Sequence, residues 1–311
     1  SLLAVRDINH KYIVVGGFSM RDIAVMTDSN AGLTQEESVR YGVEILPMSF
    51  IINGKIYYEG KDISHEEFFR KLGEDAQVST SQPSPGEVTE RWEKLLKRHD
   101  EVVYIPMSSG LSKSFETAQA LSGEYGGRVQ VVDSKRVSLP QKLMVLDGVA
   151  LAKEGKSAAE IKEMLEREAL DSAIYIAVDT LKYLKRGGRI TGAAAAIGSM
   201  LNIKPVLLVK GERLDAYEKA RGMKAARRIM LQAVRTEIED SFREYVEKGE
   251  VCLQMAHSCM EEEMIAEWTE KIREEFPGWE LLTARLPLCL SCHVGPNGFG
   301  VAVTRRIRTE K

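Results

Sequence analysis

An apolar run over residues 102–107 leads directly into a stretch of mostly small polar residues, 108–114, and then into a helical pattern. Phe115, Ala118 and Leu121 follow at helical spacing, so the region predicts a strand, a tight turn and a helix in succession. The first amides of a helix have no partners within it, and the helix dipole adds partial positive charge there. We therefore expect the hydroxyls and amides of this turn to be suited to holding an anionic oxygen.

The first half of the chain alternates short apolar runs with capped helices. Apolar runs at residues 23–27, 102–107 and 129–132 predict strands. The capping-box pattern, which marks helix starts, occurs at Thr34, Ser64, Ser84 and Ser157. Short apolar strands separated by helices indicate a parallel α/β sheet, in which ligands bind beyond the carboxyl ends of the strands. Asp28, Ser29 and the 108–114 turn fall at such ends.

The first half also contains one predicted hairpin, in which Asn53-Gly54 joins strands at 45–52 and 55–58.

The second half mixes hairpins with helices. The second half adds strands at 174–178, 203–209, 214–217, 251–256, 280–284 and 298–303, a long helix at 222–247 and another at 261–275. This mixture is typical of a mixed-sheet α+β domain. We expect a Rossmann-like α/β domain over residues 21–170 and a mixed α/β domain over 171–311.

Composition narrows the class of protein. The 311 residues are 44% hydrophobic and 29% charged, as in ordinary globular proteins, and the net charge of −3 offers no basic field for nucleic acid. No apolar run approaches the length of a membrane span, so we expect a cytoplasmic protein with reduced cysteines. The coherent pattern begins at Met20, and we expect residues 1–20 to be an extension that is poorly ordered or foreign to the natural chain.

Four cysteines raise the question of a metal. Cys289 and Cys292 are followed by His293, a spacing that suits a metal or redox pair. A structural zinc site usually has a second clean pair, and Cys252 and Cys259 are poorly spaced for one. We interpret the cysteines as buried thiols and predict neither a metal nor a cofactor.

Two hydroxyl-rich segments allow more than one interpretation. Residues 78–83, with Thr80 and Ser81, suit either a polar head group or an ordinary loop that satisfies its own backbone. The 108–114 turn suits oxyanion binding, simple helix capping or a serine nucleophile. The turn lacks the Gly-x-Ser-x-Gly pattern of hydrolases, and no histidine or acid is obviously paired with it.

Three further features have alternatives of the same kind. Gly187-Gly188 lets backbone approach a ligand, and Arg189 offers a planar fork to a carboxylate or phosphate, although a helix end with a basic cluster fits equally. Residues 192–201, rich in small side chains, suit an apolar tunnel floor or a tightly packed helix. His293, before a turn-rich stretch, suits either a structural or a functional role.

Taken together, these segments resemble the DegV family of bacterial fatty-acid-binding proteins. The resemblance rests on the order and spacing of five pieces, at residues 25–29, 80–86, 108–112, 187–190 with 203–205, and 293–296. It implies the two domains described above, with a long-chain fatty acid enclosed between them. It also implies a carrier rather than an enzyme: a fatty acid kinase related to dihydroxyacetone kinases phosphorylates the bound carboxyl group, and the acyl phosphate feeds phospholipid synthesis.

The resemblance also assigns residues. It places the fatty acid carboxylate at Thr80, Ser112 and the amide of Lys113, with Arg189 and His293 at the same end. Accessory positions would be Asp28, Ser29, Ser81, Ser109 and Gly192. Lys113 departs from the small residue usual at its position. The rival functions are a serine-dependent hydrolase or phosphotransferase acting on a small anionic substrate, and a nucleic-acid or regulatory module, which the negative charge disfavours.

Overall fold

The computed structural model describes residues 4–6, 12–14, 21–197 and 203–306. Near the N-terminus, the short strands β1 (Ala4–Arg6) and β2 (Tyr12–Val14) pair antiparallel. The expectation that residues 1–20 are poorly ordered falls mostly outside the described residues. The predicted small-residue helix ending near residue 200 also lies partly outside them, since α8 (Gly192–Ala196) is described and 198–202 are not.

The first sheet is parallel, as the alternating pattern predicted. Its strand order is β4-β3-β8-β9, formed by β4 (Val43–Leu46), β3 (Ile23–Asp28), β8 (Glu101–Ile105) and β9 (Val129–Val131). Two helices, α5 (Ser138–Lys153) and α6 (Ala158–Arg167), pack on one face. On the other face lie α3 (Pro85–Leu96) and α4 (Ser114–Ser122), around the buried Trp92. Two short 3-10 turns, η1 (Ser29–Ala31) and η2 (Gly123–Tyr125), complete this layer.

Helix starts follow the local capping chemistry. Thr34, Ser84 and Ser157 form complete capping boxes at α1 (Gln35–Tyr41), α3 and α6. Ser64 also caps α2 (His65–Gly73), where its hydroxyl accepts the amide of Glu67. The four predicted helix starts are confirmed. Each cap depends on residues within one helical turn, which is why the sequence alone was enough to predict it.

A small antiparallel sheet, β6-β5-β7, sits beside the parallel one. It contains β5 (Ser49–Ile52), β6 (Lys55–Tyr58) and β7 (Val78–Thr80). The Asn53-Gly54 hairpin is confirmed, and both turn residues have positive φ. The single strand predicted at 45–52 is wrong: Leu46 ends β4 in the parallel sheet and Ser49 begins β5 in the small one. Pro47 lies between them and lacks the N–H that a continuing ladder needs.

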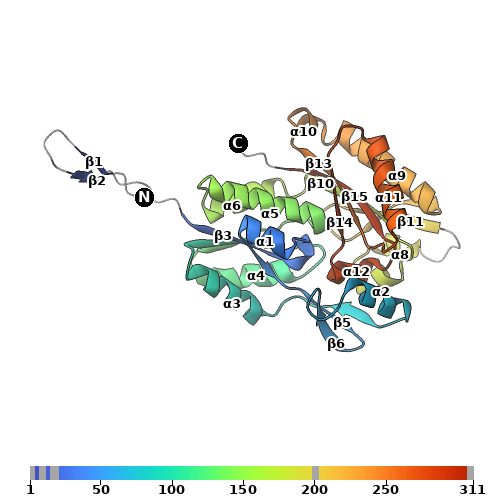
Figure 1. Ribbon diagram of the computed structural model, residues 1–311, viewed down its shortest axis with the longest axis horizontal. Helices are drawn as coiled ribbons and strands as arrows, with labels where there is room; N and C mark the ends of the chain where they lie inside the picture. The colour runs from blue at the N-terminus through green and yellow to red at the C-terminus, as the bar shows by residue number, and fades with distance from the viewer. Residues whose placement is uncertain (1–3, 7–11, 15–20, 198–202, 307–311) are drawn as a thin grey trace.

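The second large sheet is mixed, with order β12-β11-β10-β15-β13-β14. Its strands are β10 (Ser172–Ala177), β11 (Ile203–Val209), β12 (Asp215–Arg221), β13 (Val251–His257), β14 (Leu281–Arg285) and β15 (Phe299–Arg305). Neighbours run antiparallel except β13 and β14. Figure 1 shows the parallel sheet in the left part of the molecule and this mixed sheet in the right part, with α12 (Leu288–Val294) beside α2 and the small sheet.

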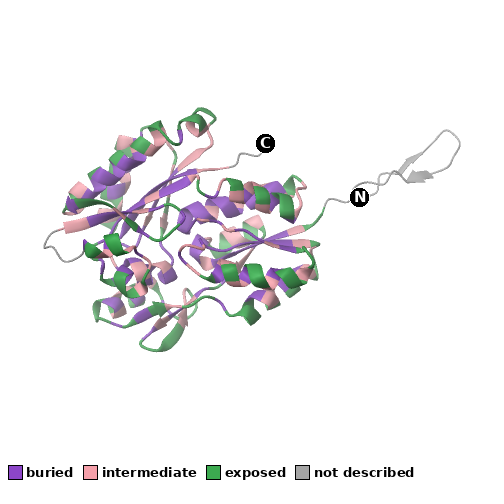
Figure 2. Ribbon diagram, turned by 180° about the vertical axis from the view of Figure 1, so that it is seen from behind, coloured by how far each residue is buried: buried purple, intermediate pink, exposed green. Residues whose placement is uncertain are grey.

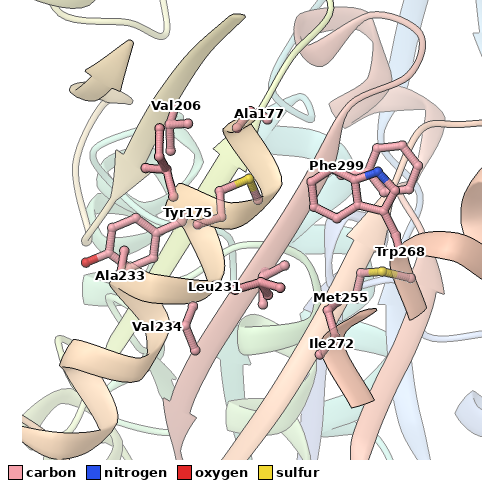
Figure 3. Packing of buried hydrophobic residues seen from close by; sticks show 14 of the residues in the cluster. Tyr175, Ala177, Val206, Leu231, Ala233, Val234, Met255, Trp268, Ile272 and Phe299 are labelled. Carbon is pink, nitrogen blue, oxygen red and sulfur yellow. The ribbon is translucent and has the colours of Figure 1, made fainter. Parts of the chain in front are cut away.

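One face of the mixed sheet carries the largest apolar core. Tyr175, Met255 and Phe299 pack there against α9 (Met223–Glu239) and α11 (Glu262–Glu275), and Trp268 stacks on Phe299 with ring centroids 4.4 Å apart (Figure 3). Burial follows this layering, since the strands are largely buried and the outer helix faces are exposed (Figure 2). The opposite face of the sheet belongs to a second apolar cluster, which includes Ile176, Val178 and Leu207.

One helical prediction needs correction, and one helix was not predicted. The helix predicted at 222–247 is two helices, α9 and α10 (Arg243–Glu247), because the backbone turns at Asp240 and Phe242 enters the core. No element was predicted for residues 288–294, which form α12 and pack on β5, β7 and α7 (Lys182–Gly187); the turn-rich stretch expected after His293 follows this helix. Among the helices that the structure describes, none is long and apolar enough to cross a bilayer.

Candidate functional site

A cavity lies against this second face of the mixed sheet, where Ile174, Ile176 and Ala256 line it. It encloses about 990 Å³ of space not occupied by protein atoms, and part of this space is open solvent. Its walls come from both halves of the chain: Met48, Met107, Leu111, Val137, Leu139 and Pro140 from the first, and Leu184, Leu214, Leu286, Cys289, Leu290 and Val294 from the second. The cavity is therefore closed by segments far apart in sequence.

The floor of the cavity follows from strand register. In one row, Ile174 pairs with Ala302, which pairs with Gln254. In the next row, Ile176 pairs with Gly300, which pairs with Ala256. Strand side chains alternate between faces, so these residues line the cavity while their neighbours enter the opposite core. Small residues in both rows leave the space that the cavity occupies.

Polar side chains gather on the same cavity from four different elements. Thr80 ends β7, Ser112 lies in the turn before α4, Arg189 follows α7 and His293 lies on α12, and all four line the cavity. The Thr80 hydroxyl and His293 Nε2 are hydrogen-bonded at 2.8 Å. The small sheet and α12, which share one apolar cluster, hold this pair in place.

The electrostatics of these groups favour an anion. Burial, together with the nearby Arg189 guanidinium, lowers the pKa of His293 to about 4, so the imidazole is neutral at pH 7. Arg189 donates to the carbonyl oxygens of Leu111 and Gly187, which fixes its side chain at the cavity wall. A fixed cation beside hydroxyls and a neutral imidazole can hold a carboxylate without a second full charge.

Ser112 is bonded in a way that does not activate it. Its hydroxyl lies 2.8 Å from that of Ser114 and accepts the Ser114 amide at 3.2 Å. The histidine at this cavity, His293, is bonded to Thr80 instead, and its Nδ1 has no partner among the described residues. A nucleophilic serine needs a base that is itself oriented by an acid.

Other residues singled out from the sequence are placed differently. Ser81 lines the cavity, whereas Lys113 points outward with its side chain 80% exposed and its ammonium 3.3 Å from Glu116. Asp28 is buried and accepts the amides of Met107 and Asn30; burial raises the pKa of its carboxyl.

Three other residues singled out from the sequence lie outside the cavity lining. Ser29 accepts the Met48 amide, Ser109 donates to Asp133, and Gly192 begins α8. These groups shape the loops around the cavity rather than its lining.

A second, open groove adjoins the polar end of the cavity. The two share Leu111, Ser112 and Arg189. The groove carries the basic residues Lys113, Lys135, Lys210 and Arg213, together with the acidic residues Glu116, Glu212 and Asp215. The polar end of the cavity therefore borders a charged surface.

Sequence reasoning missed several lining residues. Asn30 and Gln254 line the cavity but lie in segments that read as an ordinary turn and strand, whereas Gln82 belongs to the 78–83 segment already considered for a polar head group. Gln254 carried one usable signal, because it is a polar residue in an otherwise apolar strand pattern. The cysteines of α12 are both buried, which raises the pKa of the Cys289 thiol to about 12 and raises that of Cys292 as well.

Comparison with known proteins identifies the family. A family model described as uncharacterised protein, DegV family, matches residues 22–306. The chain belongs to the DegV family. A DegV domain-containing protein of Deinococcus radiodurans is 37% identical over 214 residues, which cover 68% of this chain and 76% of that protein.

Solved DegV structures share the fold. A DegV family protein from Thermus thermophilus, described by its fatty acid binding, is 33% identical with a TM-score of 0.80, covering 91% of this chain and 99% of that one. DegV from Bacillus subtilis, described as a fatty acid binding protein, is 28% identical with a TM-score of 0.77, covering 92% and 100%. Mixed α/β architecture and DegV membership, both expected from the sequence, are confirmed.

Proposed function

We propose that this chain binds a long-chain fatty acid in the cavity, with the carboxylate at Thr80, Ser112, Arg189 and His293 and the tail along the sheet floor. The observation that carries the proposal is a single cavity whose lining is apolar along its length and bears hydroxyl, imidazole and guanidinium groups together. The fatty acid binding described for the DegV proteins of T. thermophilus and B. subtilis supports it.

The acyl tail and the carboxylate head group of the ligand contribute differently to binding. Each buried methylene contributes about 0.8 kcal/mol, so a long acyl chain supplies most of the affinity. A buried carboxylate is costly unless it is hydrogen-bonded, and the Thr80 and Ser112 hydroxyls offer such bonds beside the charge of Arg189. The head group thus sets orientation more than affinity.

We further propose that the protein presents the bound carboxylate to a fatty acid kinase related to dihydroxyacetone kinases, which forms the acyl phosphate. Support comes from the groove that shares Ser112 and Arg189 with the cavity and carries Lys113, Lys135 and Lys210. The Arg189 guanidinium at this border suits a reaction that adds negative charge to the carboxyl end, whereas the three lysines are paired with Glu116, Glu212 and Glu237. In this proposal the chain is a carrier, and catalysis resides in the kinase.

The hydrolase alternative has less support. Its nucleophile would be Ser112, whose hydroxyl is bonded to Ser114, while His293 is bonded to Thr80. Without a bonded base, the Ser112 hydroxyl has no route for its proton.

The test is direct. The purified protein is extracted with organic solvent and the extract analysed by mass spectrometry, and delipidated protein is titrated with palmitic acid. We expect a co-purified long-chain acid and saturable binding. A protein that is empty after purification and does not bind added acid would contradict the proposal. Incubating the loaded protein with ATP and the kinase tests presentation separately. Fatty acid binding without phosphorylation would contradict presentation to the kinase and leave the binding proposal standing.

A further inference from the structure

One polar side chain in the cavity floor has an unused hydrogen-bonding atom. Gln254 lies on β13 and is 1% exposed, and its Oε1 accepts the Thr304 hydroxyl at 2.9 Å. The Thr304 hydroxyl is in turn 3.0 Å from that of Ser172. Gln254 Nε2 has no partner among the described residues, although the side chain lines the cavity. The carboxylate proposal makes no use of this group.

Hydroxyls in the next row of the same sheet face hold one end of the Gln254 amide. Thr304 donates to Gln254 Oε1, and the Ser172 hydroxyl, 3.0 Å from that of Thr304, continues this row. Nε2 is left without a partner among the described residues, in a residue that lines the cavity in one row with Ala302 and Ile174. A buried amide donor without a partner is unfavourable, and neither the apolar floor nor a plain methylene chain can pair with it.

The location of Gln254 sets which part of a ligand it meets. Gln254 and Val209 lie in one row across the sheet, since Val209 pairs with Ile174, Ile174 with Ala302, and Ala302 with Gln254. Three strand spacings of about 4.8 Å separate them by roughly 14 Å. Arg189 lies at the Val209 side of the cavity.

The link between Arg189 and that side is a backbone bond. The Arg189 carbonyl accepts the amide of Leu214, at the β11–β12 edge of the sheet. Gln254 therefore faces the middle or distal part of a chain whose carboxylate lies at Arg189.

We propose that Gln254 binds a hydroxyl group carried on the acyl chain, so that the preferred ligand is a long-chain fatty acid hydroxylated away from its carboxyl end. This inference rests on the proposed fatty acid site. A hydroxyl accepts from Nε2, and it also donates if the amide plane is turned to present Oε1, so it satisfies either orientation of the side chain. Gln254 then acts as a specificity-determining residue in the floor of the tunnel.

The experiment compares three acids of equal length on the delipidated full chain by isothermal titration calorimetry. They are octadecanoic acid, its derivative hydroxylated at the twelfth carbon, and its derivative hydroxylated at the second carbon, beside the carboxylate. We expect the mid-chain hydroxy acid to bind at least about fivefold more tightly than octadecanoic acid, as one added hydrogen bond allows. The acid hydroxylated beside the carboxylate should show no such gain.

The Gln254→Leu variant supplies the second arm. It replaces the amide with an apolar side chain, so the ratio of its affinities for the mid-chain hydroxy acid and for octadecanoic acid should fall to about one, whatever its affinity for octadecanoic acid itself. Equal affinity of the wild type for the octadecanoic and mid-chain hydroxy acids would overturn the inference without any variant. A preference that survives in Gln254→Leu would overturn it too. If none of the three acids binds, the proposed function itself fails, which is a distinct result.

Discussion

Thr80 and His293 are separated by 213 positions in the chain, yet the Thr80 hydroxyl lies 2.8 Å from His293 Nε2. The contact joins the last residue of β7 in the small sheet to α12, which lies between β14 and β15 of the mixed sheet in the chain. The two halves of the chain therefore meet at the polar end of the cavity. A ligand bound there contacts both halves at once.

Removing the cavity hydroxyls should weaken head-group binding. We expect the Thr80→Ala, Ser112→Ala double variant to lose at least about tenfold in palmitate affinity, because hydrogen bonds to a charged group are worth roughly 1.5–3 kcal/mol each. Calorimetric titration measures the loss, and phosphorylation by the kinase should fall with it. Thr89→Ala is the control, since the Thr89 hydroxyl is exposed and bonds to the backbone of its own helix. Unchanged behaviour of the double variant in both assays would contradict the head-group assignment.

Filling the floor should exclude the tail. Ala302 lies between Ile174 and Gln254 on the cavity side, so Ala302→Leu places three extra carbons in the space assigned to the acyl chain. We expect palmitate affinity to fall by at least about tenfold, while the free energy of unfolding stays equal or rises because the new side chain fills a cavity.

The neighbouring position offers a matched control. Val301 points into the opposite core, so Val301→Leu should overpack it and cost about 1–3 kcal/mol without weakening binding. Palmitate affinity is measured by titration and stability by urea unfolding. Full palmitate affinity in Ala302→Leu would place the tail elsewhere.

The neutral state of His293 should appear in the pH dependence of stability. Its pKa in the folded protein is about 4, below the ordinary value of 6.5, so the unfolded state binds the proton more tightly. Stability is therefore fully present above about pH 6.5 and is lost as the pH falls toward 4, by at most about 3 kcal/mol from this residue.

A comparison with His293→Asn isolates this contribution. Asparagine does not titrate, while His257 and the buried carboxyls remain in both proteins. Urea unfolding from pH 7 to pH 4.5 should show wild-type stability falling more steeply than that of the variant. Parallel curves would show that His293 keeps an ordinary pKa.

The contrast between correct and wrong predictions has a physical basis. The caps at Thr34, Ser84 and Ser157 were predictable because a cap depends on residues three positions apart. The break between α9 and α10 was not, because Phe242 leaves the helical path to reach a core built from distant strands. The helical periodicity of the sequence carries no information about a contact with those distant strands.

The same distinction between local and long-range information applies to the residues of the proposed site. The residues proposed to hold the head group, Thr80, Ser112 and Arg189, could be named from the sequence through the family resemblance, although each segment alone had a plain structural alternative. The role of Gln254 as a lining residue depends on sheet order, which places β13 two strands from β10 despite their distance in sequence. Sequence periodicity specifies which face of a strand a residue takes but not what covers that face.

Position 187 should accept only glycine, because the His293 ring lies directly against it. A Cβ at position 187 would lie 2.1 Å from His293 Nδ1 and 2.8 Å from Cε1, so Gly187→Ala must displace the imidazole and break its bond to Thr80. We expect weaker palmitate binding and a stability loss of about 1–3 kcal/mol. Gly192→Ala is the matched control, because a Cβ there meets no atom within 4 Å and stability should be unchanged or slightly higher. Equal palmitate affinity in the two variants would show that the ring position is unimportant.

Arg136 should hold the halves of the chain together. Its guanidinium is 3% exposed and donates to the carbonyl oxygens of Ala169, Glu168 and Arg305, at the junction between α6, β10 and the end of β15. Burial lowers its pKa to about 10, so it remains charged at pH 7. The Arg136 carbonyl also accepts the amide of Ser108, which links this junction to the turn that carries Ser112.

Arg136→Met keeps the side-chain volume but leaves those carbonyls without their donor. We expect a loss of about 3–5 kcal/mol in the free energy of unfolding, because a buried network loses its cation. The control is Arg128→Met: Arg128 also donates to two backbone carbonyls, of Asp100 and Leu96, but is exposed, and its loss should cost less than about 1 kcal/mol. Urea unfolding at pH 7 compares the two variants. Similar values for both would mean that water or neighbouring groups replace the Arg136 guanidinium, and that the junction does not depend on it.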